Sequence, residues 1–453
     1  MTLRQAQDSA QTTTPPPAGS AAARRPRIHP AWWVAAVAFV TIVGAAAFTA
    51  APGLLVGPLH EEFGWSRGTI GVGITLQLAL YGLTAPFAAA LMDRFGIRPV
   101  VAVALTMITL GSLGTVWMSQ SWQFVLGWGV LVGGGSGCMA LAFGATITTR
   151  WFDKRQGLVS GLLTAGGASG QLIFLPVLAV LIGELGWRAA SVTIALVAAA
   201  VIPFVLLLLR DYPADIGLAP YGASKIVPRP APATGAALRT VRVLGMAMRT
   251  KAFWLLAGAF AICGITTNGL IRTHFVPAAH DHGMATVAAA SLLAVIGIFD
   301  VVGTIFSGWL TDRFNPVVLL GVYYSLRGIS LIFLPMLLSS EVHPPMVFFI
   351  VFYGLDWVAT VPPTLALCRE VWPEDAPIVF GWVLASHQVG AGLVAWIGGV
   401  VRDVTGSYDL VWYAAGALCA AAALMSLVMP RGASLQQGMQ AEEHIPSGAP
   451  LGE

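Results

Sequence analysis

Four charged side chains stand inside long apolar segments of this chain: Arg272, Asp300, Arg327 and Asp356. A charge at the centre of a lipid bilayer costs about 2.5–3.5 kcal/mol on insertion scales, so each of these residues requires a physical reason. Residues of this kind bind a solute, carry a proton or neutralise one another. All four lie in the second half of the sequence, so we expect the chemistry to be concentrated there.

Two of these charges are placed to neutralise each other. Arg327 and Asp356 lie at similar depths in neighbouring segments that run in opposite directions. This placement predicts a structural ion pair, with a proton-coupling role for Asp356 as the alternative. Asp300, by contrast, has no basic residue one helical turn away. Because a desolvated carboxyl group favours its protonated form, Asp300 is the first candidate proton carrier and also a candidate solute ligand.

Arg272 shares a helix face with Asn268, which lies four residues earlier. The pair could anchor an anionic solute through the donors of the guanidinium group. Alternatively, Arg272 could extend to the membrane surface as a structural residue. The other candidate solute ligands are neutral or weakly basic side chains in further segments: Gln77, Tyr81, Gln171 and His387. For each of them the alternative is a hydrogen bond that ties two helices together.

Signatures of enzymes and of bound cofactors are missing from the sequence. The phosphate-binding pattern GxxxxGK[ST] does not occur, so an ATP-driven motor is not predicted. The four cysteines are isolated, and His280 with His282 offers too few ligands for a metal ion. We therefore predict no enzyme, no cofactor and no metal site, and we keep a membrane-embedded enzyme or sensor as the alternative class.

The elements that must position these side chains are membrane-spanning helices. Hydrophobic residues make up 57% of the 453 positions and charged residues 10%, against about 25% charged in a soluble domain. About 20 apolar residues suffice to cross a bilayer. Twelve segments meet this condition: Trp32–Leu54, Gly68–Leu91, Pro99–Ser119, Trp122–Thr148, Gly157–Leu181, Arg188–Leu209, Ala252–Pro277, Val287–Leu310, Val317–Leu338, Met346–Cys368, Ile378–Val401 and Tyr408–Met429. Pro52 and the pair Pro362–Pro363 remove helical hydrogen bonds and predict bends.

The distribution of basic residues predicts the orientation. With twelve spans both tails share one side, and that side holds 19 of the 24 Lys and Arg residues. The positive-inside rule then places both tails and the middle loop in the cytoplasm of a multi-pass cell-membrane protein. The net charge of +3 is explained by this asymmetry, so no nucleic-acid partner is predicted. The lipid bilayer is the expected partner of the apolar surface.

The segments divide into two halves. We predict a tail at 1–31, a six-helix half at 32–210, a cytoplasmic linker with little structure at 211–250, a second half at 251–430 and a tail at 431–453. The sequence LMDRF (91–95) closes the second segment of the first half, and LTDRF (310–314) closes the second segment of the other. This repeat predicts an all-α membrane protein with two six-helix units around a central cavity, which is the layout of a solute transporter.

The loop that contains LMDRF resembles a motif of the major facilitator superfamily. The sequence AALMDRFGIR (89–98) is similar to the pattern GxxxDRxGRR, with Ala89 for the first Gly and Ile97 for the first basic residue. The copy GWLTDRFNP, from Gly308, keeps that Gly and lacks the later part. The resemblance implies two halves that rock about a central site. It also implies that the loop is a cytoplasmic latch, with gating roles for Asp93, Arg94, Asp312 and Arg313.

A narrower resemblance is to the monocarboxylate transporter branch. WFDKRQGLVSGLLTAG (151–166) is similar to the sequence that leads into the fifth helix of that branch, and Phe299 with Asp300 resembles its eighth helix. Where the branch has an Arg one turn after the Asp, this chain has Thr304, and Trp32–Leu54 lacks the charge that the branch carries in its first helix.

The resemblance and the Asp, Arg and His candidates together predict a secondary active transporter of a small organic solute. A monocarboxylate or related organic anion coupled to protons is the first choice. Proton-coupled efflux of an apolar or cationic compound is the alternative, which the missing basic residues would favour. We expect the transporter to act as a monomer.

Overall fold

The computed structural model describes residues 29–139, 141–229 and 235–430, and nearly all of these residues are helical. The tails predicted at 1–31 and 431–453 fall almost entirely outside this range. The helices of the first half are α1 (Pro30–Ala50), α2 (Pro52–Phe63), α3 (Arg67–Phe95), α4 (Ile97–Thr115), α5 (Ser121–Phe124), the π-helical η1 (Val125–Val132), α6 (Gly133–Gly137), α7 (Leu141–Trp151), α8 (Gln156–Leu185) and α9 (Trp187–Leu208). Those of the second half are α11 (Lys251–Gly264), the π-helical η3 (Ile265–Ile271), α12 (Arg272–Asp281), α13 (Thr286–Thr311), α14 (Pro316–Leu337), α15 (Pro344–Asp356), α16 (Val361–Val371), α17 (Ala376–Thr405) and α18 (Asp409–Leu427).

Eleven helical stretches in the described residues are long and apolar enough to cross a membrane. They correspond to the predicted segments except the fourth, Trp122–Thr148, which α5, η1, α6 and α7 cover around residue 140. The predicted fold class is therefore confirmed: the chain is an all-α protein with twelve spans. The predicted bends are also present, since α1 gives way to α2 at Pro52 and the tenth span is interrupted between Asp356 and Val361.

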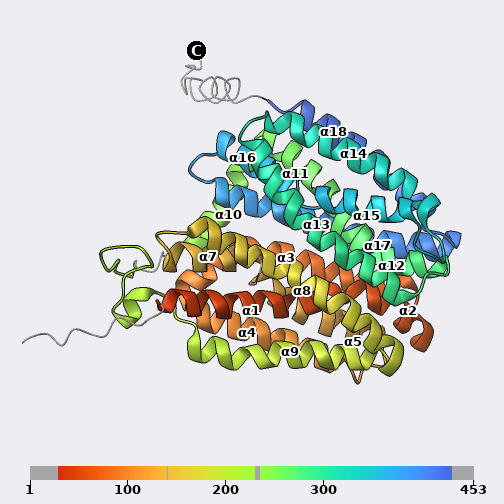
Figure 1. Ribbon diagram of the computed structural model, residues 1–453, viewed down its shortest axis with the longest axis horizontal. Coiled ribbons are helices and arrows are strands. Elements are labelled where there is room, and N and C mark those ends of the chain that lie inside the picture. Colours follow the sequence, from red (N-terminus) through yellow and green to blue (C-terminus); the bar gives the residue numbers. More distant parts are fainter. Residues whose placement is uncertain (1–28, 140, 230–234, 431–453) are drawn as a thin grey trace, which may run out of the picture.

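The two sets of helices form two bundles side by side. Figure 1 shows α1 to α9 in the lower bundle and α11 to α18 in the upper one, with the helix axes nearly parallel. We call the end of the bundles with α7, α10 and α16 the tail face, because the described part of the chain begins and ends toward it. The end with α2 and α12 is called the opposite face.

The bundles meet closely along α3 and α17. A Cβ added at Gly71 would lie 2.8 Å from the carbonyl oxygen of Ala395, and one added at Gly392 would lie 2.9 Å from that of Thr75. The Thr75 hydroxyl donates a hydrogen bond of 2.6 Å to the Gly392 carbonyl. Small residues thus allow the backbones of the two halves to touch, as in other membrane helix pairs.

The linker contains more structure than the sequence indicated. It includes a short 3-10 turn, η2 (Pro213–Ile216), and a three-turn helix, α10 (Ala236–Ala247). α10 packs against α3 of the first half and α17 of the second. The expectation of little structure is therefore wrong for residues 236–247, where Thr240, Val243 and Ala247 form a buried face at helical spacing.

Candidate solute-binding site

A small cavity lies between the two halves near the middle of the spans. Its volume is about 50 Å³, and its lining comes from α1, α2, α3, η3, α12 and α17. The lining residues are Thr49, Pro52, Ile74, Gln77, Leu78, Tyr81, Asn268, Arg272, Thr273 and Gln388. Because sites that hold organic ligands usually measure about 300–1,000 Å³, an organic solute could occupy this cavity only after the halves move apart.

The seventh span brings Arg272 and Asn268 to the cavity through a local change of helix geometry. η3 is π-helical, and such wider turns often occur at functional sites. The hydroxyl of Thr273 donates to the carbonyl of Asn268 over 3.1 Å, and the Asn268 amide donates to Gln388 Oε1 over 3.4 Å. Asn268 therefore connects the seventh span to α17 beside the cavity.

Arg272 is the cation of the cavity. Its guanidinium carbon lies 5.7 Å from the centre of the Trp357 ring, which is a cation–π distance. In the described part of the chain Arg272 forms no ion pair. A largely desolvated guanidinium without a carboxylate partner leaves its positive charge available to an anion.

On the side of the first half, α3 supplies Gln77 and Tyr81. Gln77 is buried, and its Oε1 accepts a hydrogen bond of 2.9 Å from the indole nitrogen of Trp128. This bond fixes the Gln77 side chain, so that its amide NH₂ remains the group available to a solute carbonyl or carboxylate oxygen. Ile74 and Leu78 line the same cavity, so it has an apolar part as well as a polar one.

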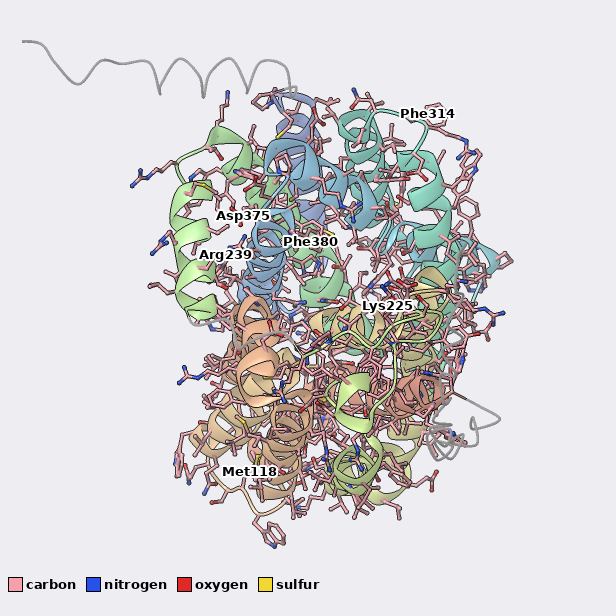
Figure 2. The ribbon with its side chains drawn as sticks, turned by 90° about the vertical axis from the view of Figure 1, so that its left-hand side faces the viewer. Met118, Lys225, Arg239, Phe314, Asp375 and Phe380 are labelled. Atoms are coloured by element: carbon pink, nitrogen blue, oxygen red, sulfur yellow. The ribbon has the colours of Figure 1, made fainter. Side chains whose placement is uncertain are left out.

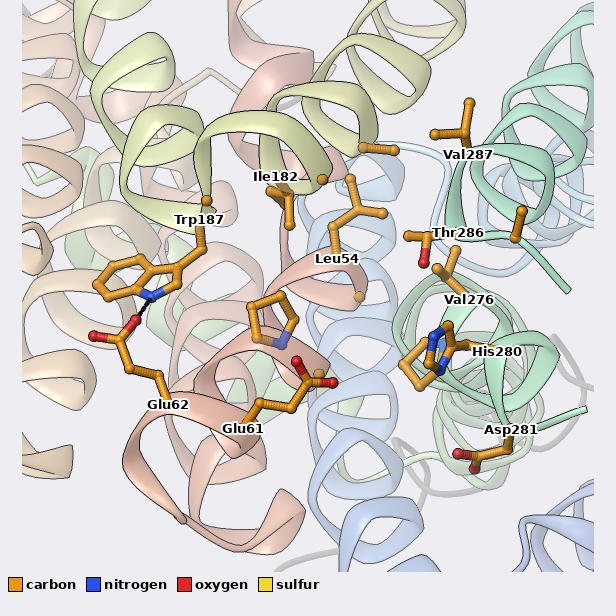
Figure 3. A pocket seen from close by; sticks show the side chains of 18 of the residues that line it. Leu54, Glu61, Glu62, Ile182, Trp187, Val276, His280, Asp281, Thr286 and Val287 are labelled. Carbon is orange, nitrogen blue, oxygen red and sulfur yellow. Dashed lines mark hydrogen bonds between the residues drawn. The ribbon is translucent and has the colours of Figure 1, made fainter. Parts of the chain in front are cut away.

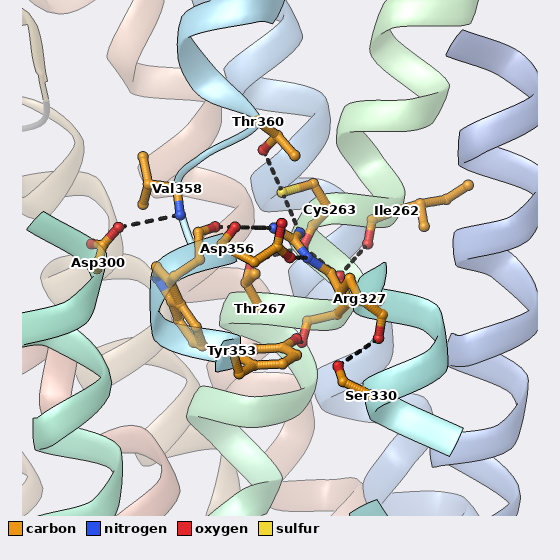
Figure 4. A network of polar contacts seen from close by, with 12 residues as sticks. Ile262, Cys263, Thr267, Asp300, Arg327, Ser330, Tyr353, Asp356, Val358 and Thr360 are labelled. Atoms are coloured by element: carbon orange, nitrogen blue, oxygen red, sulfur yellow. Dashed lines mark hydrogen bonds and ion pairs between the residues drawn. The ribbon is translucent and has the colours of Figure 1, made fainter. Parts of the chain in front are cut away.

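Asp300 does not line this cavity but lies beside the break in the tenth span. One oxygen of its carboxylate accepts from Thr304 over 3.1 Å and from the backbone N–H of Val358 over 3.2 Å. Val358 is in the interruption between α15 and α16, where backbone groups lose their helical partners (Figure 4). Such groups must be satisfied by side chains when they lie at membrane depth, so Asp300 helps to hold the broken helix.

Arg327 also contacts this interruption, and it forms the predicted ion pair with Asp356. Arg327 Nε lies 2.5 Å from Asp356 Oδ2, and Arg327 is fully buried (Figure 4). The guanidinium also donates to the backbone carbonyls of Asp356 and Trp357 and to the sulfur of Cys263. The ion pair thus links the seventh, ninth and tenth spans within the second half.

Two predicted solute ligands lie elsewhere. His387 Nε2 is 3.3 Å from the Thr267 hydroxyl, and its ring contacts Phe260, so it faces α11 and η3 within the second half. Its neighbour Gln388 lines the cavity instead. Gln171 lies on α8, outside the set of residues that line the cavity.

A second and larger pocket opens toward the opposite face. It has a volume of about 640 Å³ and lies among α2, α12 and the ends of α8 and α13. Figure 3 shows Glu61 of α2 and His280 of α12 on opposite sides of it. A pocket of this volume is in the range that takes organic ligands, so it is a candidate entrance to the central cavity.

One close contact between α2 and α12 lies next to both the larger pocket and the cavity. Pro52 lines the cavity and Leu54 the larger pocket, while Gly53 between them meets α12. A Cβ at Gly53 would lie 2.5 Å from the carbonyl oxygen of Arg272. On the same face Arg67 of α3 lies 3.6 Å from Asp403 of α17, which also accepts from the Gly68 N–H over 3.0 Å. These contacts join the two halves at the opposite face.

Gly53→Ala is expected to push α2 away from α12 and to connect the cavity with the larger pocket, because its methyl group would overlap a backbone oxygen. A cysteine placed at Leu78 should then react several-fold faster with a water-soluble maleimide. Gly57→Ala is the matched control, since it is in the same helix and a Cβ there meets nothing within 4 Å. Equal reaction rates in the two variants would contradict the role given to Gly53.

At the tail face the two predicted latch sequences differ in their contacts. Asp93 forms an ion pair with Arg150, whereas Arg94 lies near the ring of Phe95, with its guanidinium carbon 5.1 Å from the ring centre. In the second half Arg313 donates to the carbonyl of Trp309 over 3.1 Å and lies over its ring. Asp312 ends α13 and has no ion-pair partner among the described residues.

The glycine of the first latch sequence has a local explanation. Gly96 has φ of 93°, a conformation that favours glycine, and a Cβ there would meet the Asp211 carboxylate. That carboxylate accepts from the Ile97 N–H over 2.6 Å at the amino terminus of α4. Burial raises the pKa of the phenol of the next residue, Tyr212. The guanidinium carbon of Arg150 lies over the Tyr212 ring, 4.4 Å from its centre. The predicted latch sequence thus contacts the segment that follows the sixth span.

Comparisons with known proteins agree with this architecture. The family model described as Major Facilitator Superfamily matches residues 36–377. The uncharacterized MFS-type transporter YcxA of Bacillus subtilis (strain 168) is 25% identical over 384 residues, covering 84% of this chain and 90% of that protein. Monocarboxylate transporter 11 of Homo sapiens is 28% identical over 416 residues, covering 88% of this chain and 83% of the relative. Among solved structures, a D-xylose-proton symporter is similar in fold, with a TM-score of 0.69 at 14% identity, covering 89% of this chain and 99% of that one.

Proposed function

This chain belongs to the major facilitator superfamily, and on that premise we propose that it carries a small monocarboxylate or related organic anion together with protons. The observation that supports the proposal most is Arg272, a cation that lines a small cavity between the halves and forms no ion pair with any described residue. In a medium of low effective dielectric an anion needs such a fixed cation. Several relatives are named monocarboxylate transporters, which is consistent with this choice.

The solute would bind with its two ends in different surroundings. Its carboxylate would lie between Arg272, Asn268 and the amide of Gln77, which together offer charged and neutral donors. Its apolar part would lie against Ile74 and Leu78. Access would alternate as the bundles rock about the seam of α3 and α17, with the Gly53 contact closing the path to the opposite face.

We assign the coupling proton to Asp300. It forms no ion pair among the described residues, it is partly buried, and it contacts the interrupted part of the tenth span beside Trp357. Trp357 in turn lies against Arg272. Gain or loss of a proton at Asp300 would change its bond to the Val358 N–H, and hence the packing of Trp357 near the solute.

Asp93, Arg94, Asp312 and Arg313 are proposed to regulate opening at the tail face. We also propose that this face is cytoplasmic, because the tail side holds most of the basic residues. The protein is proposed to act as a monomer in the cell membrane.

The experiment that tests the function is transport in proteoliposomes that contain the purified protein. Small monocarboxylates, neutral analogues and organic cations would be offered with and without an imposed pH gradient. Accumulation of a carboxylate that depends on the gradient is expected. Transport of cations or apolar compounds alone would contradict the proposal and favour proton-coupled efflux.

Asp300→Asn is expected to abolish uphill accumulation while solute exchange continues, because the amide oxygen can still accept from Val358 but the side chain cannot bind a proton. Accumulation and exchange would be measured in the same vesicles. Ser307→Ala is the control, since Ser307 donates to the Ala359 carbonyl over 2.5 Å in the same interruption without any change of charge. Normal uphill transport by Asp300→Asn would assign the proton to another group.

A further inference from the structure

The linker helix α10 has an exposed surface that the transport cycle described above does not use. One side of the helix is buried on the bundles. On the exposed side Leu238, Val241 and Met248 share a face by their spacing and are 61%, 49% and 42% exposed. Two basic residues are also exposed here, Arg242 on the helix and Arg249 in the turn that follows its end. Apolar and basic residues side by side are typical of helices that lie in the plane of a membrane surface.

The position of α10 agrees with a location at the membrane surface. Figure 2 shows it at the edge of the tail face, beside the start of α17. Trp254, in the first turn of the span that begins with α11, is 55% exposed and donates to the Met248 carbonyl over 2.8 Å. Tryptophan is enriched at the level of lipid headgroups, so Met248 and the end of α10 lie where this span leaves the bilayer.

The two arginines on this surface can bind an anionic partner. Neither Arg242 nor Arg249 forms an ion pair with a described residue. Arg239, by contrast, points to the bundle and lies 2.8 Å from Asp375, which immediately precedes α17 (Figure 2). The surface next to the bilayer therefore offers positive charge and apolar side chains together. An anionic phospholipid has the matching chemistry, a negative headgroup above acyl chains.

We propose that α10 binds anionic phospholipid headgroups through Arg242 and Arg249 and inserts Leu238, Val241 and Met248 beneath them. The helix also joins the two halves, because it packs on α3 and α17 and its Thr240 carbonyl accepts from Trp382 of α17 over 3.0 Å. Lipid binding would thus stabilise a strap across the tail-side ends of α3 and α17. This makes movement of the halves sensitive to the lipid charge of the membrane.

The test is hydrogen exchange of the α10 amides in the full-length protein, reconstituted in nanodiscs of phosphatidylcholine alone or of a mixture rich in phosphatidylglycerol. We expect slower exchange in the anionic mixture, by about fivefold for each arginine that contacts headgroups. Arg242→Gln combined with Arg249→Gln should remove the difference between the two lipids. Lys225→Gln is the control, because Lys225 is an exposed basic residue of the tail face outside α10 (Figure 2).

Two results would contradict the binding of headgroups by α10, and a third would contradict the insertion of its apolar side chains. The first is equal exchange of the wild-type α10 amides in both lipids, which would also be the result if a protein partner rather than lipid covered the surface. The second is a Lys225→Gln variant that loses as much of the lipid dependence of α10 exchange as the single variant Arg242→Gln does. That result would mean that the total charge of the tail face matters, and not the charge on α10. Leu238→Ser should raise α10 exchange in the anionic mixture, and an unchanged rate would exclude insertion of the apolar stripe.

Discussion

Arg272→Gln is expected to weaken the binding of a carboxylate solute roughly 10- to 100-fold, since a hydrogen bond to a charged group contributes about 1.5–3 kcal/mol. The binding of a neutral analogue of the same shape should change far less. Arg272→Lys should restore only part of the loss, because lysine keeps the charge but not the two parallel donors. Binding would be measured with both ligands on the purified protein.

Arg369→Gln is the control for this prediction, because it removes an exposed guanidinium group of α16 that does not line the cavity. It should leave both affinities unchanged. If Arg272→Gln weakened the carboxylate and the neutral analogue equally, Arg272 would be a structural residue that supports Trp357. The organic-anion proposal would then lose its main support, and efflux of apolar or cationic compounds would become the better explanation.

The fold could be predicted from the sequence because a bilayer leaves few choices. Low charge content and long apolar segments require helices, and the repeated DRF sequence identifies equivalent places in two halves. What could not be predicted was local. The helix α10 lies in a stretch rich in Pro, Ala and basic residues, and its formation depends on contacts with α3 and α17, which are distant in the sequence. Tertiary packing, rather than local preference, decides such a helix.

The cavity was predicted in part. Gln77, Tyr81, Asn268 and Arg272 do line it, and each was visible as a polar residue in an apolar segment. To decide whether His387 or Gln388 lines the cavity, one must know how α17 is rotated about its own axis, since successive residues on a helix point about 100° apart. That rotation follows from α17 packing on α11, where a Cβ at Gly264 would lie 1.7 Å from the His387 carbonyl oxygen. No pattern near position 387 indicates this contact.

The role of Asp300 as a partner of the broken tenth span was also missed. The pair Pro362–Pro363 predicted a bend, and the break indeed precedes it. The bend implies backbone groups without helical partners, and buried polar side chains of neighbouring spans are the natural partners at that depth. Asp300, Ser307 and Arg327 supply them. A link between proline pairs and nearby buried charges could therefore have been drawn from the sequence.

Either single neutral substitution in the pair of Arg327 and Asp356 is expected to destabilise the protein severely. Removal of one partner leaves an uncompensated buried charge, which costs roughly 3–5 kcal/mol. The double variant Arg327→Gln with Asp356→Asn should recover much of this loss. Arg327→Met with Asp356→Leu should recover less, because the carbonyls of Asp356 and Trp357 lose the donors that now satisfy them, at about 1–3 kcal/mol for each buried group.

The thermal unfolding of the detergent-solubilised variants would measure these differences. Arg402→Gln is the control, since Arg402 pairs with Asp281 over 2.6 Å but both side chains are partly exposed. An exposed pair contributes at most about 1 kcal/mol, so this variant should stay close to the wild type.

Asp356 Oδ1 is buried without a hydrogen-bond partner among the described residues, which leaves one position where a proton could bind. If Asp356→Asn kept its stability but lost proton-driven transport, Asp356 would belong to the proton pathway, and the structural explanation of the pair would be wrong.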